Sequence, residues 1–339
     1  MTRNYLAIGI LLLVVVILAG FSALKSFGGD VSEYSDTDPV IAAAYWAERI
    51  KVNGAQAAYA EFKTRNVQSA ERGRHLAAHI IGEKIFESEG VLGIRYCDAS
   101  FSFGCYHGFF GQAFARGGAE AIEELDAVCV RAFGPLGTGC QHGMGHGVLE
   151  YVGYQNIGKA LLLCEKTTQS APLLGCASGV FMEYNTPLVG ISDTVSPETR
   201  KFSKETFDEP CRSVADSYKK SCYFELGGWL ESALYGQDTR IGEVCSSLPT
   251  EWRSLCFQGF GALVPQRVRY DSDKSHAVCD VFSVEDALSC RSGVAWAMYS
   301  VPEHRGKTEV ACAYSNDVMR ERCMKQADLT EGKSQFPNL

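Results

Sequence analysis

The sequence predicts an all-α fold, a disulfide-stapled helical-repeat solenoid that follows a single N-terminal transmembrane helix. Three observations predict it: an uncharged apolar segment, fourteen cysteines in regular pairs, and a repeat of about 34 residues. The chain has 339 residues, of which 46% are hydrophobic and 21% are charged, a composition that suits a sizeable core. A net charge of −8 argues against a nucleic-acid partner, because no run of Lys and Arg is dense enough to neutralise phosphates.

Residues 5–24, YLAIGILLLVVVILAGFSAL, carry no formal charge and are long enough to cross a hydrocarbon core of roughly 30 Å as one helix. Arg3 precedes the segment and acidic residues follow it, so the positive-inside rule places the bulk of the chain in a periplasmic, extracellular or lumenal space. A cleaved signal peptide is the alternative, because small residues end the segment. We favour an uncleaved membrane anchor at residues 1–24, followed by a linker at 25–38, because the apolar run exceeds the usual signal-peptide core.

The cysteines predict seven disulfides between sequence neighbours. Five of the seven pairs are 11 positions apart, and a loop of about a dozen residues contributes roughly 3 kcal/mol when it is closed, in the chain-entropy model. Zinc knuckles are the alternative, but they need C-x-x-C couples and the sequence has none. The predicted pairs are Cys97 with Cys105, Cys129 with Cys140, Cys164 with Cys176, Cys211 with Cys222, Cys245 with Cys256, Cys279 with Cys290, and Cys312 with Cys323.

The second cysteine of each pair recurs at a period typical of two-helix repeats, and one long step is explained by an insertion at residues 185–210. Each unit is predicted to be a short helix that ends at the first cysteine, a turn, and a longer helix with the second cysteine in its early turns. From about residue 90 to 325 this pattern resembles the Sel1-like and tetratricopeptide (TPR) repeats, although the spacing within the pairs is longer than in Sel1-like units. The resemblance implies an architecture and no specific function.

The helical-repeat ectodomain is predicted to span residues 39–325. A capping pair of helices, beginning near residues 39 and 55, precedes the repeats, and residues 326–339 are expected to form a polar tail. Five of six units aligned on the second cysteine have glycine three positions later, which on a helix allows close approach of a neighbouring backbone.

The histidines occupy equivalent positions in consecutive repeats. His107 and His142 both stand two positions after the second cysteine of their units, and His146 follows four residues later. The segment RHLAAHIIGEKIF at 74–86 fits the same frame without its cysteine. It places His75 level with His142 and His79 level with His146.

These five histidines are the candidate metal ligands. Residues four apart share one helix face, and equivalent helices of adjacent repeats pack about 8 to 10 Å apart, so the imidazoles can reach one ion or two. Imidazole binds zinc, copper and iron well, and the sequence does not distinguish these metals. The alternative is that each ring is hydrogen-bonded to a backbone carbonyl or a water.

Glu83 and Glu150 lie one helical turn beyond the histidine pairs and are the candidate catalytic carboxylates, because a carboxylate beside a metal can transfer a proton. A hydrolytic and an oxidative reaction would both use these ligands, and whether the protein is an enzyme stays open. The histidine spacing is similar to that in type 3 copper proteins, which is an analogy only. Asp98, Gln112 and Tyr151 lie near the same register and are weaker candidates for orienting ligands or substrate.

A membrane-tethered scaffold, which binds a peptide, protein or glycan on the concave face of the array, is the alternative function. In the later repeats the positions equivalent to His142 carry Ser178, Phe224, Gln258 and Ser292, which suit recognition better than metal binding. The two remaining histidines, His276 and His304, fall outside the pattern and are expected at the surface.

Overall fold

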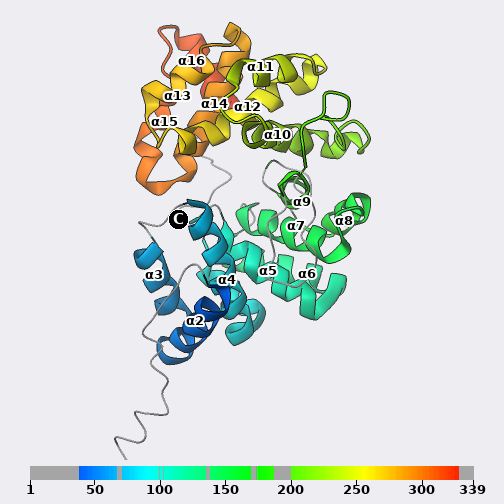
Figure 1. Ribbon diagram of the computed structural model, residues 1–339, viewed down its shortest axis with the longest axis vertical. Coiled ribbons are helices and arrows are strands. Elements are labelled where there is room, and N and C mark those ends of the chain that lie inside the picture. The colour runs from blue at the N-terminus through cyan, green and yellow to red at the C-terminus, as the bar shows by residue number, and fades with distance from the viewer. Residues whose placement is uncertain are drawn as a thin grey trace, which may run out of the picture.

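The computed structural model is helical, and no strand occurs within the residues that it describes (Figure 1). Those residues are 38–66, 71–98, 100–101, 103–134, 138–168, 173, 175–186 and 200–327. The predicted all-α class is therefore confirmed for this part of the chain.

Eight helices form a central row in which each helix packs against the next in chain order. They are α4 (Glu71–Glu89), α5 (Gly104–Gly117), α7 (Thr138–Val152), α9 (Cys176–Asn185), α10 (Asp216–Ala233), α12 (Thr250–Arg267), α14 (Val284–Ser300) and α16 (Asp317–Gln326). The row curves, so that its N-terminal half fills the lower part of Figure 1 and its C-terminal half the upper part. Phe103, just before α5, packs against the cluster of Phe224 on α10 and Ala262 on α12, so the two halves meet across the inner face.

The shorter helices flank this row. They are α2 (Pro39–Asn53), α3 (Ala55–Asn66), η1 (Gly90–Tyr96), η2 (Gly118–Ala121), α6 (Ile122–Phe133), α8 (Ile157–Cys164), α11 (Asp238–Ser246), α13 (Ser272–Cys279), η3 (Pro302–Lys307) and α15 (Thr308–Ala311). The predicted N-terminal pair is confirmed as α2 and α3, and the Asp38 carboxylate accepts hydrogen bonds from two backbone amides at the start of α2. Trp46 of α2 and Phe62 of α3 are fully buried, with ring centroids 5.3 Å apart.

All seven predicted disulfides form, and no cysteine is free. Their Cα–Cα distances lie between 5.4 and 5.7 Å, the usual range for an undistorted bridge. Each bond ties the element before a central helix to the early turns of that helix, as the spacing predicts. Two details differ: Cys129 lies inside α6, which continues to Phe133 because the turn that follows begins only at Gly134, and Cys211 lies in a series of turns before α10 and not at the end of a helix.

Glycines bring successive central helices into backbone contact. A Cβ atom on Gly108 of α5 would lie 1.9 Å from the carbonyl oxygen of His79 on α4, and one on Gly82 of α4 would lie 2.1 Å from the carbonyl oxygen of Cys105. Any side chain at these positions would force the helices apart. The same reciprocal pairing recurs at α7/α9 (Gly145 and Gly179), α10/α12 (Gly227 and Gly259) and α12/α14 (Gly261 and Gly293). The predicted packing role of the repeated glycines is confirmed at these crossings.

Several sequence predictions lie outside the described residues. These are the anchor at 1–24, nearly all of the linker at 25–38, the middle of the insertion at 185–210, and residues 328–339 of the tail. Among the described helices, none has the length and apolar character needed to span a bilayer. The solenoid and its likeness to TPR or Sel1-like repeats stay predictions.

Candidate metal centre

Two histidine pairs lie on the inner faces of α4 and α7. On α4, Nε2 of His79 and Nε2 of His75 are 3.0 Å apart, and on α7, Nε2 of His146 and Nε2 of His142 are 3.1 Å apart. The i,i+4 spacing places both rings of a pair on one face, one turn apart. Nitrogens bound to one zinc ion at about 2.0 to 2.1 Å stand roughly 3 Å apart when the bond angle is near 95°, so each pair has a chelating separation. A hydrogen bond between two imidazoles would give the same distance.

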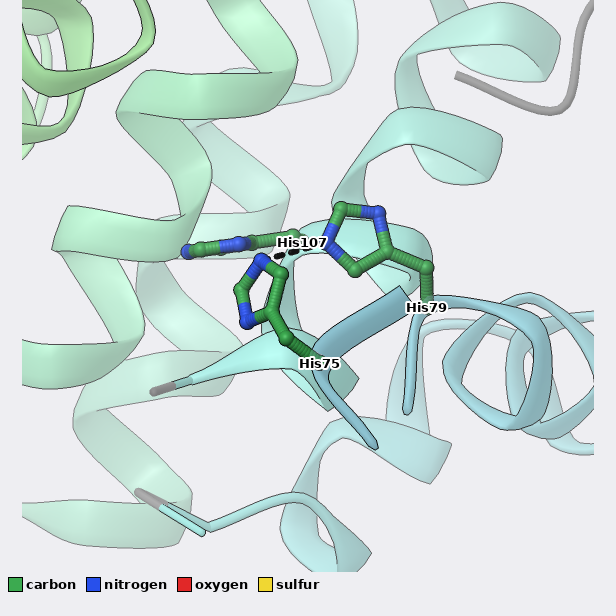
Figure 2. A group of neighbouring side chains, drawn as sticks. All are labelled: His75, His79 and His107. Carbon is green, nitrogen blue, oxygen red and sulfur yellow. Dashed lines mark hydrogen bonds between the residues drawn. The ribbon is translucent and has the colours of Figure 1, made fainter. Parts of the chain in front are cut away.

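His107 of α5 lies between the two pairs. Its ring centroid is 5.1 Å from that of His75, 5.2 Å from that of His79 and 3.8 Å from that of His146. Figure 2 shows its ring beside those of His75 and His79, with α4 and α5 supplying the three side chains. The ligand nitrogens form two groups, each within 4.8 Å, and His107 belongs to both: one with His75 and His79, the other with His142 and His146. The structure thus brings together all five histidines that the sequence singles out.

Helix packing produces this proximity. Gly108 follows His107 directly and lies against the backbone carbonyl of His79, so α5 approaches α4 at the level of the histidines. On the other side of α5, a Cβ atom on Gly147 of α7 would lie 2.9 Å from the backbone carbonyl carbon of Phe110. The predicted convergence of imidazoles from three neighbouring helices depends on these glycine crossings.

One ring of each pair is oriented by a group outside the cluster. His75 Nδ1 lies 2.7 Å from the carbonyl oxygen of Phe101 and His146 Nδ1 lies 2.8 Å from Oε2 of Glu183, so in each ring Nδ1–H donates and Nε2 is left with its lone pair. The Tyr154 hydroxyl donates to Oε1 of the same Glu183 carboxylate. Metal-binding histidines usually have such an acceptor behind them, because it fixes the tautomer and the ring orientation.

Sequence reasoning missed Glu183 and Tyr154. Glu183 belongs to α9, in a repeat whose histidine positions are occupied by other residues, and it lies 37 positions beyond His146. Tyr154 follows the end of α7. Only the contact between α7 and α9 brings the two residues to the centre, so no local spacing marks them.

His107 differs from the other four in having no hydrogen bond at either ring nitrogen, within the described part of the chain. The residue is 4% exposed, so bulk solvent hardly reaches it. A neutral imidazole has one donor and one acceptor, and a buried polar group left without a partner costs about 1 to 3 kcal/mol. Nδ1 of His142, which is 2% exposed, also has no partner among the described groups.

Burial keeps these imidazoles neutral. Desolvation lowers the pKa of all five rings below the usual value for histidine, to about 4 for His142, and the neighbouring imidazoles add repulsion at His79, His107 and His146. The hydrogen bond to the Phe101 carbonyl opposes the shift at His75. Neutral imidazole is the form that binds a metal, so protons do not compete for these nitrogens near pH 7.

The two candidate carboxylates flank α5 beyond the histidines. A Cβ atom on Gly111 of α5 would lie 3.2 Å from Oε2 of Glu150, so this α7 carboxylate lies over α5, while Glu83 belongs to α4. Burial raises the pKa of Glu83 to about 7, with further repulsion from Glu87 and Glu150 and opposition from Lys84. The protein atoms around the Glu150 carboxyl partly desolvate it and also raise its pKa, although the residue as a whole is exposed. A carboxyl with a pKa near neutrality can both give and take a proton at pH 7.

The weaker candidates have other partners. Asp98 accepts hydrogen bonds from Tyr59 and Lys63, which ties η1 to α3 and indicates a structural role. Gln112 donates to Glu87 at 3.3 Å, and Tyr151 is 47% exposed.

The remaining two histidines lie apart from the cluster, as predicted. His276 Nε2 lies 3.1 Å from the carbonyl oxygen of Ala311, and His304 stacks on Tyr270 with ring centroids 3.9 Å apart. Both are partly buried, so the expectation of simple surface positions is wrong in this respect, because neighbouring segments cover one side of each ring.

The equivalent positions in the later repeats are buried and have internal partners. The Ser178 hydroxyl donates to Glu225, Gln258 donates to the carbonyl oxygen of Gln326 at 2.8 Å, and Ser292 donates to that of Ser289 at 2.7 Å. Phe224 is 5% exposed. These side chains do not form an open recognition surface, so the scaffold hypothesis loses its main support at these positions.

Comparison of the chain with protein-family models, with curated proteins and with solved structures finds no match. The functional argument therefore depends on the geometry of the site.

Proposed function

We propose that the five-histidine cluster, His75, His79, His107, His142 and His146, binds a transition metal and forms the functional centre of an extracytoplasmic protein. The observation that carries the proposal is the buried His107 ring, whose two nitrogens have no hydrogen-bond partner among the described residues although four other imidazoles surround it. Hydrogen bonding within each pair gives every other ring at least one partner without a metal, but it leaves both nitrogens of His107 without one in the described part of the chain. Zinc, copper and iron all suit an all-imidazole set.

Glu83 and Glu150 support an enzymatic use of this centre. A bound ion would polarise a substrate oxygen or acidify a water, and a nearby carboxyl with a raised pKa would carry the proton. Both hydrolytic and oxidative reactions remain open, and the choice between them follows from which metal the protein holds.

The compartment follows from the cysteines. Seven disulfides and no free cysteine suit an oxidising environment such as a periplasm, an extracellular space or a secretory lumen. We also propose that residues 5–24 tether the helical array, a solenoid in this interpretation, to the membrane. Recovery of the mature chain without these residues would instead show a cleaved signal peptide.

Metal analysis of the purified full chain tests the proposal. We expect close to stoichiometric zinc, copper or iron in the wild-type protein, and loss of most of it in the double variant His79→Ala/His146→Ala, which removes one ligand from each pair. The matched control is His276→Ala/His304→Ala, which removes two histidines outside the cluster and should retain the metal. If the wild-type protein takes up none of the three metals after reconstitution, or if both double variants lose metal equally, the proposal is wrong.

A further inference from the structure

His107 is the one residue shared by the two ligand groups, and no group of described ligand atoms contains both histidine pairs. Each pair forms a group of three with His107, but the ligand atoms of all five histidines do not lie within 4.8 Å of one another. Nitrogens bonded to one ion at about 2.0 to 2.1 Å can be no more than about 4.2 Å apart, so the five nitrogens as placed do not fit around one ion.

Each pair has the nitrogen separation of a two-nitrogen chelate, which it becomes when the proton shared by its two Nε2 atoms moves away. Nε2 of His75 and His146 are directed by the acceptors behind their Nδ1 atoms, the Phe101 carbonyl and the Glu183 carboxylate, toward the partner ring of their own pair. A third ligand for either pair has to come from a ring beside it. His107 contacts both: its ring meets that of His75 edge to face at a centroid distance of 5.1 Å, and it stacks on that of His146 at 3.8 Å. A shared ion on the second side therefore requires the two stacked rings to turn their nitrogens toward it.

The His107 ring can serve both sides because neither of its nitrogens is used by a hydrogen bond within the described chain. Figure 2 shows the His107 ring edge-on beside the rings of His75 and His79. Neither a backbone carbonyl nor a carboxylate fixes its tautomer, in contrast to His75 and His146. An imidazole held in this way is suited to bind a cation through each nitrogen.

We propose, on the basis of the metal site proposed above, that His107 bridges two metal ions as an imidazolate. One ion is held by His75, His79 and one nitrogen of His107, and the second is held by His142, His146 and the other nitrogen. Formation of the bridge breaks the single N–H bond of the neutral His107 ring, forms one metal–nitrogen bond on each side and releases one proton to solvent. Each ion then has three imidazole ligands and an open position, which is the ligand number of catalytic zinc sites.

Copper(II) is the probe for this bridge, because two copper(II) ions joined by an imidazolate couple magnetically and lose most of their ordinary paramagnetic resonance signal. We expect the metal-free full chain to take up two copper(II) ions, with a resonance signal at two equivalents far below that of two isolated ions. His107→Ala should restore the signal of isolated copper(II) in proportion to the copper bound. His276→Ala should behave as the wild-type protein.

The outcomes separate the two proposals. One tightly bound copper per chain, or two with the full signal of isolated ions, would overturn the bridge and leave the metal site intact. Absence of copper binding, together with absence of zinc and iron binding, would overturn both. If His107→Ala does not fold, the wild-type signal measured at one and at two equivalents still tests the bridge, because a full signal of isolated ions after the second ion binds would overturn it.

Discussion

Helices α4 and α5 cross in the same way as helices α12 and α14, yet only the first crossing is lined by histidines. At both crossings a glycine faces a backbone carbonyl: Gly108 faces that of His79 and Gly293 faces that of Gln258. Disulfides staple the central helices in both halves of the row. The close packing of these helices therefore does not require histidine, and the histidines of the N-terminal half must have another reason to be there.

The two halves also differ in how their buried polar groups are satisfied. In the C-terminal half, Gln258 and Ser292 donate to backbone carbonyls, and Glu225 accepts a hydrogen bond from Ser178. In the N-terminal half, His107 is equally buried and its nitrogens have no such partner among the described residues. Oε2 of Glu231 and the Tyr314 hydroxyl, in the C-terminal half, also have no hydrogen-bond partner in the part of the chain that the structure describes, but only His107 has two such atoms there. Because a stable core avoids this cost, His107 is the position where a ligand is most strongly indicated.

The largest effect should come from filling the glycine crossings. Gly108→Ala and Gly293→Ala each place a Cβ about 2 Å from a carbonyl oxygen, and each should lower the free energy of unfolding by about 3 kcal/mol, because the helices must separate. Only Gly108→Ala should also weaken metal binding, since it moves His107 away from α4. Chemical denaturation and metal titration, performed where both variants are folded, measure the two effects. If Gly108→Ala and Gly293→Ala lose the same metal affinity, metal binding depends on the stability of the whole fold. The α4–α5 crossing would then have no specific role in the metal centre.

A smaller effect is expected at the carboxylate behind His146. Glu183→Gln replaces the carboxylate that accepts a hydrogen bond from Nδ1–H of His146 by a neutral amide. The change should weaken metal binding about tenfold or more. Glu165→Gln is the matched control, because Glu165 also accepts from a tyrosine, Tyr218 at 2.6 Å, but lies away from the histidines. Competition with a chromophoric chelator measures both affinities. Unchanged affinity in Glu183→Gln would show that this glutamate has no influence on the centre.

The most gradual effect is the pH dependence that one buried carboxyl group gives to the stability of the C-terminal half. Burial raises the pKa of Glu225 to about 8, and the hydrogen bond from Ser178 opposes the shift. The folded protein keeps this proton where the unfolded chain has released it, so the contribution of Glu225 to stability is full near or below pH 4.5 and is lost as the pH rises from there to about 8. The slope from this one group is at most about 1.4 kcal/mol per pH unit.

Glu225→Gln should flatten that slope, because the amide cannot ionise. Urea unfolding at several pH values between 5 and 8 measures it, with Glu251→Gln at an exposed position of α12 as the control. A variant that retains the wild-type slope would show that Glu225 is not the group responsible.

The sequence predicted much of this protein because its strongest signals are periodic. Cysteines 11 positions apart can be bridged only if two neighbouring elements fold back on each other, so the seven disulfides follow from spacing. His75 with His79, and His142 with His146, share a helix face by the geometry of the α-helix itself. The alignment of the repeats then places His107 at the position equivalent to His75 and His142.

Other features were decided by tertiary structure. Glu183 and Tyr154 reach His146 only through the packing of α9 on α7, and the partners of Ser178 and Gln258 come from helices whose contact no local pattern encodes. The lack of a partner at His107 is likewise a property of everything packed around the ring. By itself the sequence determined the helices, the disulfides and the facing histidines, because these follow from spacings within one repeat. Only the tertiary structure decided which imidazole lies between the two pairs and which groups orient the others, because such contacts depend on how closely the glycine crossings bring separate helices together.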